Sequence, residues 1–220
     1  MARGGSKRLP GKNIKLLNGK PLIGYAIDCA LEISGSENIY VSTDNDDIIK
    51  VVEEYGVRVP FKRPAELAED NSSSESAMMH AVDFYEKSYG ELDYIVLLQP
   101  TSPFRTASQV KEAIKLFEEN PGVDMVVSVK KALYTPYSNM FEENSKGFLK
   151  KSKITEGEFP SVYSYNGAIY VISVNSLRKF ERHTNFEKII KYEMDKLHSV
   201  DIDEKLDWLL AEQIIKHKLI

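Results

Sequence analysis

Residues 2–13 combine glycines and cations in a way that could bind a multiply charged anion. The stretch reads Ala-Arg-Gly-Gly-Ser-Lys-Arg-Leu-Pro-Gly-Lys-Asn. Its cations are Arg3, Lys7, Arg8 and Lys12, and its glycines are Gly4, Gly5 and Gly11. Glycine can take positive φ, so backbone N–H groups can crowd around an anion where a Cβ would obstruct them. The cations would surround the same anion. The pattern therefore predicts a cradle for a triphosphate.

The alternative is that this stretch is a solvated basic arm with flexible glycines. Glycine-rich phosphate motifs produce many false positives, so spacing alone leaves this alternative open. The stretch matches neither Gly-x-Gly-x-x-Gly nor the Walker pattern that ends in Gly-Lys-Ser/Thr. This argues against a dinucleotide cofactor and against an ordinary P-loop hydrolase.

Asp201 and Asp203 form the second group with chemical potential. In an extended chain, residues two apart face the same way, so both carboxylates would project together while Ile202 points to the core. Two such carboxylates suit Mg²⁺, which also bridges substrate phosphates. The alternative is that Asp201 caps the last helix with Glu204 as its capping-box partner. Local sequence leaves both possibilities open.

Other polar residues carry weaker signals. Arg63 lies in a proline-containing loop, where it either binds a ligand or is simply solvated. Gln99 follows the apolar stretch 94–98 and is either a ligand contact or a turn residue before proline. Asn166 precedes a glycine and would by itself indicate a tight turn. Tyr170 lies in an apolar strand, where a core position is the alternative.

Strands and helices are expected to alternate along the chain. Apolar stretches predict strands over 39–44, 57–59, 94–98, 124–129 and 168–172. Helical spacing predicts helices that begin after Pro21 and that contain residues 48–55, 78–85, 110–117 and 206–214. We expect Gly56 to cap the second helix, and Ser72 with Glu75 to form a capping box before the third. The alternation predicts a doubly wound, mostly parallel α/β sheet, with ligands beyond the carboxyl ends of its strands.

Composition narrows the class of protein. With 220 residues, the chain is long enough for one core, so we expect a single domain over 1–220. A net charge of −4 gives no general polyanion-binding surface, and no nucleic-acid partner is expected. The single cysteine, Cys29, is expected in the core and cannot form an internal disulfide, which fits a reducing cytoplasm. The apolar run 95–98 is too short to cross a bilayer, and no secretory signal precedes the first loop.

The loop at residues 2–13 resembles the signature loop of the acylneuraminate cytidylyltransferases, the CMP-sugar synthetases, which are related to the CMP-Kdo synthetases. Further matches to that family follow in the expected order across nearly the whole chain. They are Val41-Ser42-Thr43-Asp44, Arg63-Pro64-Ala65-Glu66-Leu67-Ala68, Leu98-Gln99-Pro100-Thr101-Ser102-Pro103, Asn166-Gly167-Ala168-Ile169-Tyr170 and Asp201-Ile202-Asp203. Several motifs in the same order make the resemblance specific.

The resemblance implies a nucleotidyltransferase that joins CTP to a 2-keto sugar acid and releases a CMP-sugar and pyrophosphate. The nucleotide-binding residues that it implies are Arg3, Gly4, Gly5, Ser6, Lys7, Lys12, Asn13, Arg63 and Ser74. The sugar-binding residues that it implies are Gln99, Asn166 and Tyr170. It implies that Asp201 and Asp203 bind Mg²⁺ or another divalent cation and act in catalysis with Arg3 and Lys12. It also implies a homodimer, with residues 130–165 as an inserted dimerisation element.

Two departures from the family pattern stand out. Family members begin with an apolar strand directly before the loop, and here only Met1 stands in that place. Such a strand is central in a doubly wound sheet, so its loss would leave strand edges unpaired; we interpret this as a mis-assigned start or a shortened chain. The alternative is a catalytically silent nucleotide-binding protein.

The second departure concerns the sugar. Sialic-acid enzymes tend to carry basic residues shortly before the Asn-Gly-Ala-Ile-Tyr segment, whereas residues 158–165 here contain neither Arg nor Lys. This weakens the assignment of N-acetylneuraminate as the sugar. Kdo, or an unusual acid such as legionaminic or pseudaminic acid, stays an alternative.

Overall fold

The computed structural model describes residues 1–153 and 157–220. Its α-helices are α1 (Leu22–Leu31), α2 (Asp46–Glu54), α3 (Ser74–Tyr89), α4 (Ala107–Glu118), α5 (Val174–Phe180) and α6 (Lys205–Lys216). Its strands are β1 (Leu16–Leu17), β2 (Lys20–Pro21), β3 (Tyr94–Leu97), β4 (Met125–Lys131), β5 (Phe141–Glu143), β6 (Leu149–Lys151), β7 (Tyr163–Ser173) and β8 (Ile189–Glu193). Short 3₁₀ turns are η1 (Lys12–Ile14), η2 (Ser36–Asn38), η3 (Ala65–Leu67) and η4 (His183–Asn185).

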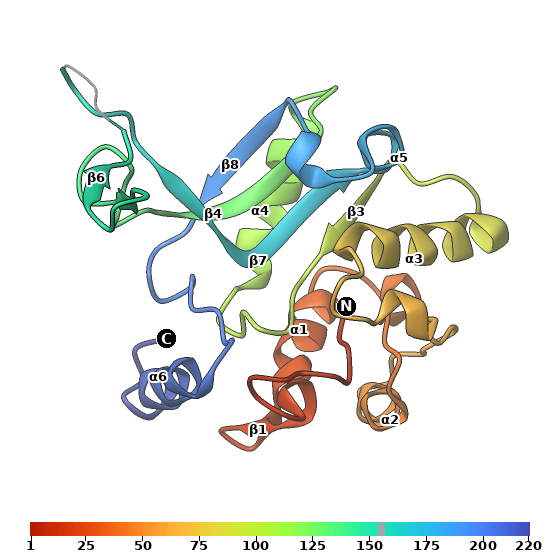
Figure 1. Cartoon of the computed structure of the whole chain (residues 1–220). Helices are drawn as coiled ribbons and strands as arrows, with labels where there is room; N and C mark the ends of the chain where they lie inside the picture. Colours follow the sequence, from red (N-terminus) through yellow and green to blue (C-terminus); the bar gives the residue numbers. More distant parts are fainter. Residues whose placement is uncertain (154–156) are drawn as a thin grey trace.

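The central sheet has the strand order β3-β7-β4-β8 (Figure 1). β4 and β8 pair in parallel, while β7 is antiparallel to both β3 and β4. Strands β3, β4 and β8 therefore run in one direction and β7 runs against them. The predicted α/β class is confirmed, but the sheet that the described residues form is mixed rather than mostly parallel, because one of its ladders is parallel and two are antiparallel.

Helices cover both faces of this sheet, since successive side chains of a strand point to opposite faces and the first five residues of β4 are all buried. On one face, Val126 packs with Val110 of α4 and Cys29 of α1. On the other face, Met125 packs with Met78 of α3 and with Leu177 of α5. The fold is thus a doubly wound α/β arrangement, and Cys29 lies in its core as a free thiol, as predicted.

The predicted strands over 94–98, 124–129 and 168–172 are confirmed as β3, β4 and part of β7. Residues 39–44 and 57–59 are not strands. The segment 39–44 is nevertheless close to the start of the chain, since the Ala2 N–H donates to the Ser42 carbonyl at 3.0 Å. A ladder needs a neighbouring strand at about 4.8 Å, and the described residues place no strand beside this segment. The prediction of a strand at 39–44 is therefore wrong in this structure.

Helix positions follow the predicted pattern, but one cap differs. Ser73, not Ser72, caps α3 by accepting a hydrogen bond from the Ser76 N–H at 3.0 Å. Ser72 instead donates to the carbonyl of Glu66, and Glu75 contacts His183 across the structure. Because the side chains of Ser72 and Glu75 make these other contacts, they do not form the predicted capping box. Gly56 follows α2 with φ of 74°, the left-handed conformation expected at a helix end.

Strands β5 and β6 form a hairpin that projects from the sheet (Figure 1). This hairpin lies within residues 130–165, the range that the resemblance implies as a dimerisation element; residues 154–156 of that range lie outside the described residues. Every residue of the two strands is exposed. In the part of the chain that the structure describes, no helix is both long and apolar enough to span a bilayer.

Candidate nucleotide-binding and active site

A polar cavity of about 580 Å³ lies beside the N-terminal loop. It collects side chains from the loop, from residues 63–74, from the end of β3 and from the segment before α6. The predicted site residues that line it are Arg3, Ser6, Lys7, Lys12, Asn13, Arg63, Ser74, Gln99 and Asp203. The fold thus brings together side chains that lie as far as 200 positions apart in the sequence.

The shape of the loop is fixed by contacts rather than by three left-handed glycines. Only Gly11 among the three has positive φ, at 66°, and it directly precedes η1. Gly4 is required for a different reason, because a Cβ there would lie 2.8 Å from the Cβ of Asn45. The Gly4 N–H donates to Asp44 Oδ1 at 3.0 Å, and Asn13 Nδ2 donates to the Arg3 carbonyl at 3.0 Å. These bonds hold the loop against the segment around Asp44.

Asp70 carries the carboxylate that two of the loop cations, Arg3 and Lys7, contact in this structure. Arg3 Nη1 lies 3.0 Å from Asp70 Oδ1, and Lys7 Nζ pairs with Asp70 Oδ2. The hydrogen bond from Lys7, followed by its charge, lowers the pKa of Asp70. Arg3 and Lys7 can therefore reach a common anionic group, as a phosphate-binding loop requires. Sequence analysis missed Asp70, which carries no recognisable motif.

Lys12 is the buried cation of the loop. Its residue is only 8% exposed, and its Nζ donates to the Ile202 carbonyl at 2.7 Å and to Asp203 Oδ1 at 3.1 Å. The start of η1 holds the backbone of Lys12, so its ammonium has little freedom. This places a positioned positive charge directly beside the predicted metal-binding pair.

Asp201 and Asp203 are held by the packing of the residue between them. Ile202 is fully buried, and its N–H donates to the Thr101 carbonyl at 2.8 Å. The helix cap belongs to other residues, because Glu204 and Asp207 form the capping box of α6. The alternative of Asp201 as the helix cap is therefore wrong.

The environment of Asp201 is suited to a cation. Its Oδ1 is buried and has no hydrogen-bond partner within the described residues. Burial, and then the nearby Asp203 carboxylate, raise the pKa of Asp201. A divalent cation would satisfy the orphaned oxygen and offset the repulsion between the two carboxylates. No group of three or more metal-binding side chains occurs among residues 1–153 and 157–220, so these two residues would leave most cation ligands to phosphate and water.

Arg63 is buried rather than solvated, with 7% of its surface exposed. Its Nε donates to Ser42 Oγ at 2.9 Å and its Nη2 donates to the Ser42 carbonyl at 2.6 Å. Its own N–H donates to the Thr43 carbonyl at 2.8 Å. Arg63 therefore fixes the segment 42–44 that supports the loop, while it also lines the cavity.

We expect Arg63→Met to lower the free energy of unfolding by about 2–3 kcal/mol, because a hydrogen bond to a charged group contributes roughly 1.5–3 kcal/mol. Urea unfolding would measure the change. Arg58→Met is the matched control, because Arg58 is exposed and should change stability by less than about 0.5 kcal/mol. Equal effects of the two substitutions would contradict a structural role for Arg63.

The three predicted sugar-binding residues occupy different environments. Gln99 lines the cavity at the end of β3. Tyr170 lies nearby on β7, where burial, and then the charge of Asp201, raise its pKa to about 12. Asn166 is 1% exposed, and its amide bonds to Ser128, Ser199 and other protein groups. Its main-chain carbonyl accepts from Ser102, so Asn166 ties β7 to the loop after Gln99. A direct sugar contact by any of the three stays a prediction.

Arg105 is a buried residue of this region that sequence analysis did not single out. It donates to the main-chain carbonyl of Gln99, while its Nε and Nη1 have no partner in the described part of the chain. Burial lowers its pKa to about 10. The sequence signal that could have identified Arg105 as a residue of this site is its position two residues after the Leu98–Pro103 motif.

A match to a protein-family model identifies the family to which the chain belongs. Residues 1–207 match the family model described as cytidylyltransferase. The chain belongs to the cytidylyltransferase family. It is 34% identical to the CMP-N,N'-diacetyllegionaminic acid synthase of Legionella pneumophila, with 98% of this chain and 94% of that protein covered. It is also 34% identical to the N-acylneuraminate cytidylyltransferase of Escherichia coli, where 99% of this chain spans 51% of the relative.

Solved structures support the same fold for this cytidylyltransferase. A CMP-2-keto-3-deoxy-manno-octonic acid synthetase, solved in complex with CTP, matches with a TM-score of 0.70 at 18% identity. The match covers 99% of this chain and 96% of that chain. A 4-diphosphocytidyl-2C-methyl-D-erythritol synthase from Anaerococcus prevotii matches with a TM-score of 0.62. Because the family match makes the chain a nucleotidyltransferase, the cavity beside the N-terminal loop is its candidate active site.

Proposed function

We propose that this cytidylyltransferase activates a nonulosonic or related 2-keto sugar acid with CTP, giving a CMP-sugar and pyrophosphate. The observation that carries the proposal is the convergence of Arg3, Lys7 and Lys12 with the carboxylate of Asp203 around one cavity. Relatives named as synthases of CMP-diacetyllegionaminic acid and as acylneuraminate cytidylyltransferases support the substrate class.

In the proposed reaction, an anomeric hydroxyl oxygen of the sugar attacks the α-phosphorus of CTP. A P–O bond forms to the sugar, and the proton of the attacking hydroxyl passes to solvent. The bond between the α-phosphorus and the oxygen that bridges to the β-phosphate breaks, and pyrophosphate leaves with that oxygen and the negative charge. Arg3 and Lys7 would hold the phosphates, and Lys12 would stabilise charge on the reacting phosphate. Positioning of the two substrates supplies much of the remaining acceleration.

Asp201 and Asp203 would hold the divalent cation, and the orphaned Asp201 Oδ1 supports this assignment. When bound, Mg²⁺ would supply electrostatic stabilisation of phosphate charge and make a coordinated hydroxyl more acidic. Lys12 donates to Asp203 in the structure, so this ammonium would orient the carboxylate. Ser6, Asn13, Arg63 and Ser74, which line the cavity, would complete the nucleotide site beside Gly4 and Gly5.

The sugar is tested by pyrophosphate release with CTP, Mg²⁺ and a panel of N-acetylneuraminate, legionaminic, pseudaminic and Kdo acids. Residues 158–165 contain no Arg or Lys, so we expect a sugar other than N-acetylneuraminate to be preferred. Preference for one acid of the panel supports the proposal and names the substrate. Release with none of them, in protein that still binds CTP, would contradict it and favour a nucleotide-binding protein without catalysis.

We also propose a homodimer formed through residues 130–165, in a cytoplasmic enzyme. Large apolar side chains are exposed on and around the β5–β6 hairpin; they are Leu133, Tyr134, Met140, Phe141, Phe148, Leu149 and Phe159. Such a patch on a projecting element is typical of an interface. The buried, unpaired Cys29 supports a reducing compartment.

Replacing Phe148 and Leu149 together with aspartate is expected to convert a dimer to the 25.0 kDa monomer in sedimentation experiments. Charge on a buried apolar patch opposes association. Leu219→Asp is the control, because Leu219 is also exposed but lies at the far end of the chain, away from the hairpin. Sedimentation of the unmodified chain as a monomer would contradict the proposed interface.

A further inference from the structure

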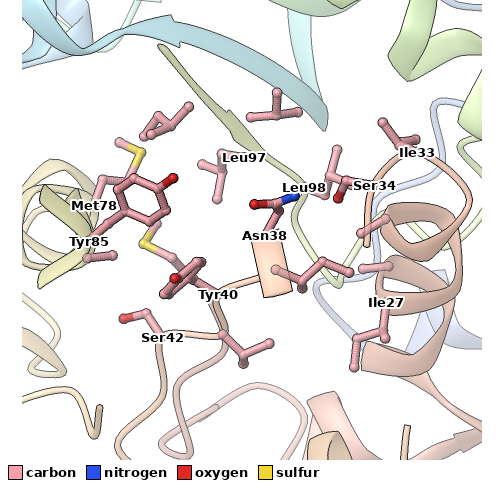
Figure 2. Close-up of a pocket in the computed structure, with 18 of the residues that line it drawn as sticks. Ile27, Ile33, Ser34, Asn38, Tyr40, Ser42, Met78, Tyr85, Leu97 and Leu98 are labelled. Atoms are coloured by element: carbon pink, nitrogen blue, oxygen red, sulfur yellow. The ribbon is translucent and has the colours of Figure 1, made fainter. Parts of the chain in front are cut away.

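A cluster of buried polar side chains lies between β4 and β7, close to the predicted metal-binding pair. Its members are Ser128, Asn166 and Ser199, none of which is more than 2% exposed. The interior beside β3 is different, because Leu97 and Leu98 line a mainly apolar cavity of about 480 Å³ there (Figure 2). Apolar side chains would be buried at lower cost, since buried polar groups need hydrogen-bond partners to offset their desolvation. The cluster is therefore a candidate for a role other than packing.

Ser128 lies at an irregularity in the pairing of β4 with β7. The register shifts within β4, so that Ser128 faces the β7 residues 166–169 instead of a single partner. Its Oγ accepts from the Ile169 N–H at 2.7 Å and so satisfies a main-chain donor at the irregularity. Its one proton can be donated to Asn166 Oδ1 at 2.5 Å or to the Ile169 carbonyl at 3.1 Å, and the shorter distance favours Asn166. Ser128 therefore fixes the orientation of the Asn166 amide.

The Asn166 amide connects β7 to the segment before α6. With its oxygen held by Ser128, its Nδ2 donates to Ser199 Oγ at 2.9 Å. Ser199 lies two residues before Asp201, while Ile202, directly after Asp201, is held by its main-chain hydrogen bond to the loop that follows β3. The main chain of Asp201 is thus restrained on both sides, and one of the two restraints depends on the amide.

Gly167 brings the main chain of β7 against the Asp201 carboxylate. Gly167 has φ of 76°, and a Cβ at this position would lie 3.3 Å from Asp201 Oδ2. The preceding Asn166 carbonyl accepts from Ser102 Oγ at 3.3 Å, which holds this turn of the main chain in place. Contact at Oδ2 restricts rotation of the carboxylate, while Oδ1 is the oxygen that has no hydrogen-bond partner in the described residues.

We propose that Ser128 and Ser199 are positioning residues, which hold Asp201 in the orientation that binds a divalent cation. Both act through the Asn166 amide. The inference rests on the proposed function, in which Asp201 is a metal ligand. Neither serine lines the nucleotide cavity, so their role is separate from contact with CTP. Groups that orient metal ligands typically contribute 10- to 100-fold to metal affinity or activity.

The test measures the binding of Mn²⁺ alone, as a paramagnetic substitute for Mg²⁺, to the full chain by electron paramagnetic resonance. We expect Ser128→Ala and Ser199→Ala each to raise the dissociation constant for Mn²⁺ by about tenfold. Because both serines act through one amide, the double variant should lose much less than the roughly 100-fold product of the two effects. Asp201→Asn should abolish the binding, which assigns the signal to this site.

Ser176→Ala is the matched control for stability. Ser176 on α5 donates to Asp124 Oδ1 at 2.6 Å, just before β4 begins, so its loss also removes a serine hydrogen bond but leaves the cluster intact. We expect all three single serine variants to unfold at a lower temperature than the unmodified chain. Only the two variants in the cluster should bind Mn²⁺ more weakly.

A purely structural role predicts a different result. Cluster variants that are less stable but bind Mn²⁺ like the unmodified chain would overturn the proposal, as would equal weakening of Mn²⁺ binding by Ser176→Ala. Ser199→Ala carries the same test if Ser128→Ala does not fold. Absence of Mn²⁺ binding by the unmodified chain would overturn the metal assignment and this inference with it. The expected Mn²⁺ results without any pyrophosphate release would support this inference and contradict the proposed reaction, so the two are separable.

Discussion

Replacing Asp201 with asparagine is expected to lower pyrophosphate release by about 1000-fold. Asparagine keeps the shape of the side chain but removes the charge that would hold a divalent cation. Metal ions supply several kcal/mol of charge stabilisation, and a 1000-fold loss corresponds to about 4 kcal/mol. The rate would be measured with saturating CTP and sugar over a series of Mg²⁺ concentrations.

Asp47→Asn is the matched control for this substitution. Asp47 is exposed on α2, and its single ion pair within the described residues is with Lys50 at 3.5 Å, so its replacement should leave the rate within a factor of two. The Asp201→Asn protein should also unfold at the same temperature as the unmodified chain or higher, because the substitution removes a buried charge. A tenfold loss or less, with the Mg²⁺ dependence unchanged, would contradict the assignment of Asp201 as a metal ligand.

Replacing Lys12 with methionine is the second substitution with a large expected effect. Methionine retains the apolar length of the side chain and removes the ammonium beside Asp203. Removal of one preorganised group that stabilises transition-state charge typically costs 100- to 1000-fold in kcat. We therefore expect kcat to fall by roughly that factor, with a smaller change in KM for CTP.

Lys15→Met provides the control in the same part of the chain. Lys15 is exposed directly after η1, and its Nζ lies 4.4 Å from the Trp208 ring centroid, away from Asp203. Its loss should alter kcat by less than about threefold. If Lys12→Met raised KM for CTP while leaving kcat intact, Lys12 would contribute to ground-state binding rather than to the chemical step.

Local sequence patterns predicted those helices and strands whose burial follows a regular periodicity along the chain. The strand at 94–98 and the helix that contains Val110 follow from hydrophobic periodicity, and both are present. The loop at residues 2–13 was predicted from residue type, and its cations do lie around one cavity. Each of these features can be recognised from residues that are close together in the sequence.

The features that the sequence did not predict depend on contacts between segments that are distant in the sequence. Residues 39–44 have the composition of a strand, but a ladder also needs a neighbour, which the pattern cannot reveal. Glu75 has capping-box spacing, yet it contacts His183, which is distant in sequence. Asp70 pairs with Arg3 across more than sixty positions, so no local motif could place it in the site. Asp201 could be separated from a helix cap only when the cap of α6 was seen.

The most direct test of the proposed function is phosphorus NMR of the unmodified chain with CTP, Mg²⁺ and the sugar acid that the panel selects. The account predicts that the three CTP resonances decline while a CMP-sugar phosphodiester and pyrophosphate appear in equal amounts, only when the sugar is present. Unchanged CTP in the presence of bound nucleotide and every sugar acid, or release of pyrophosphate without a phosphodiester product, would contradict the account.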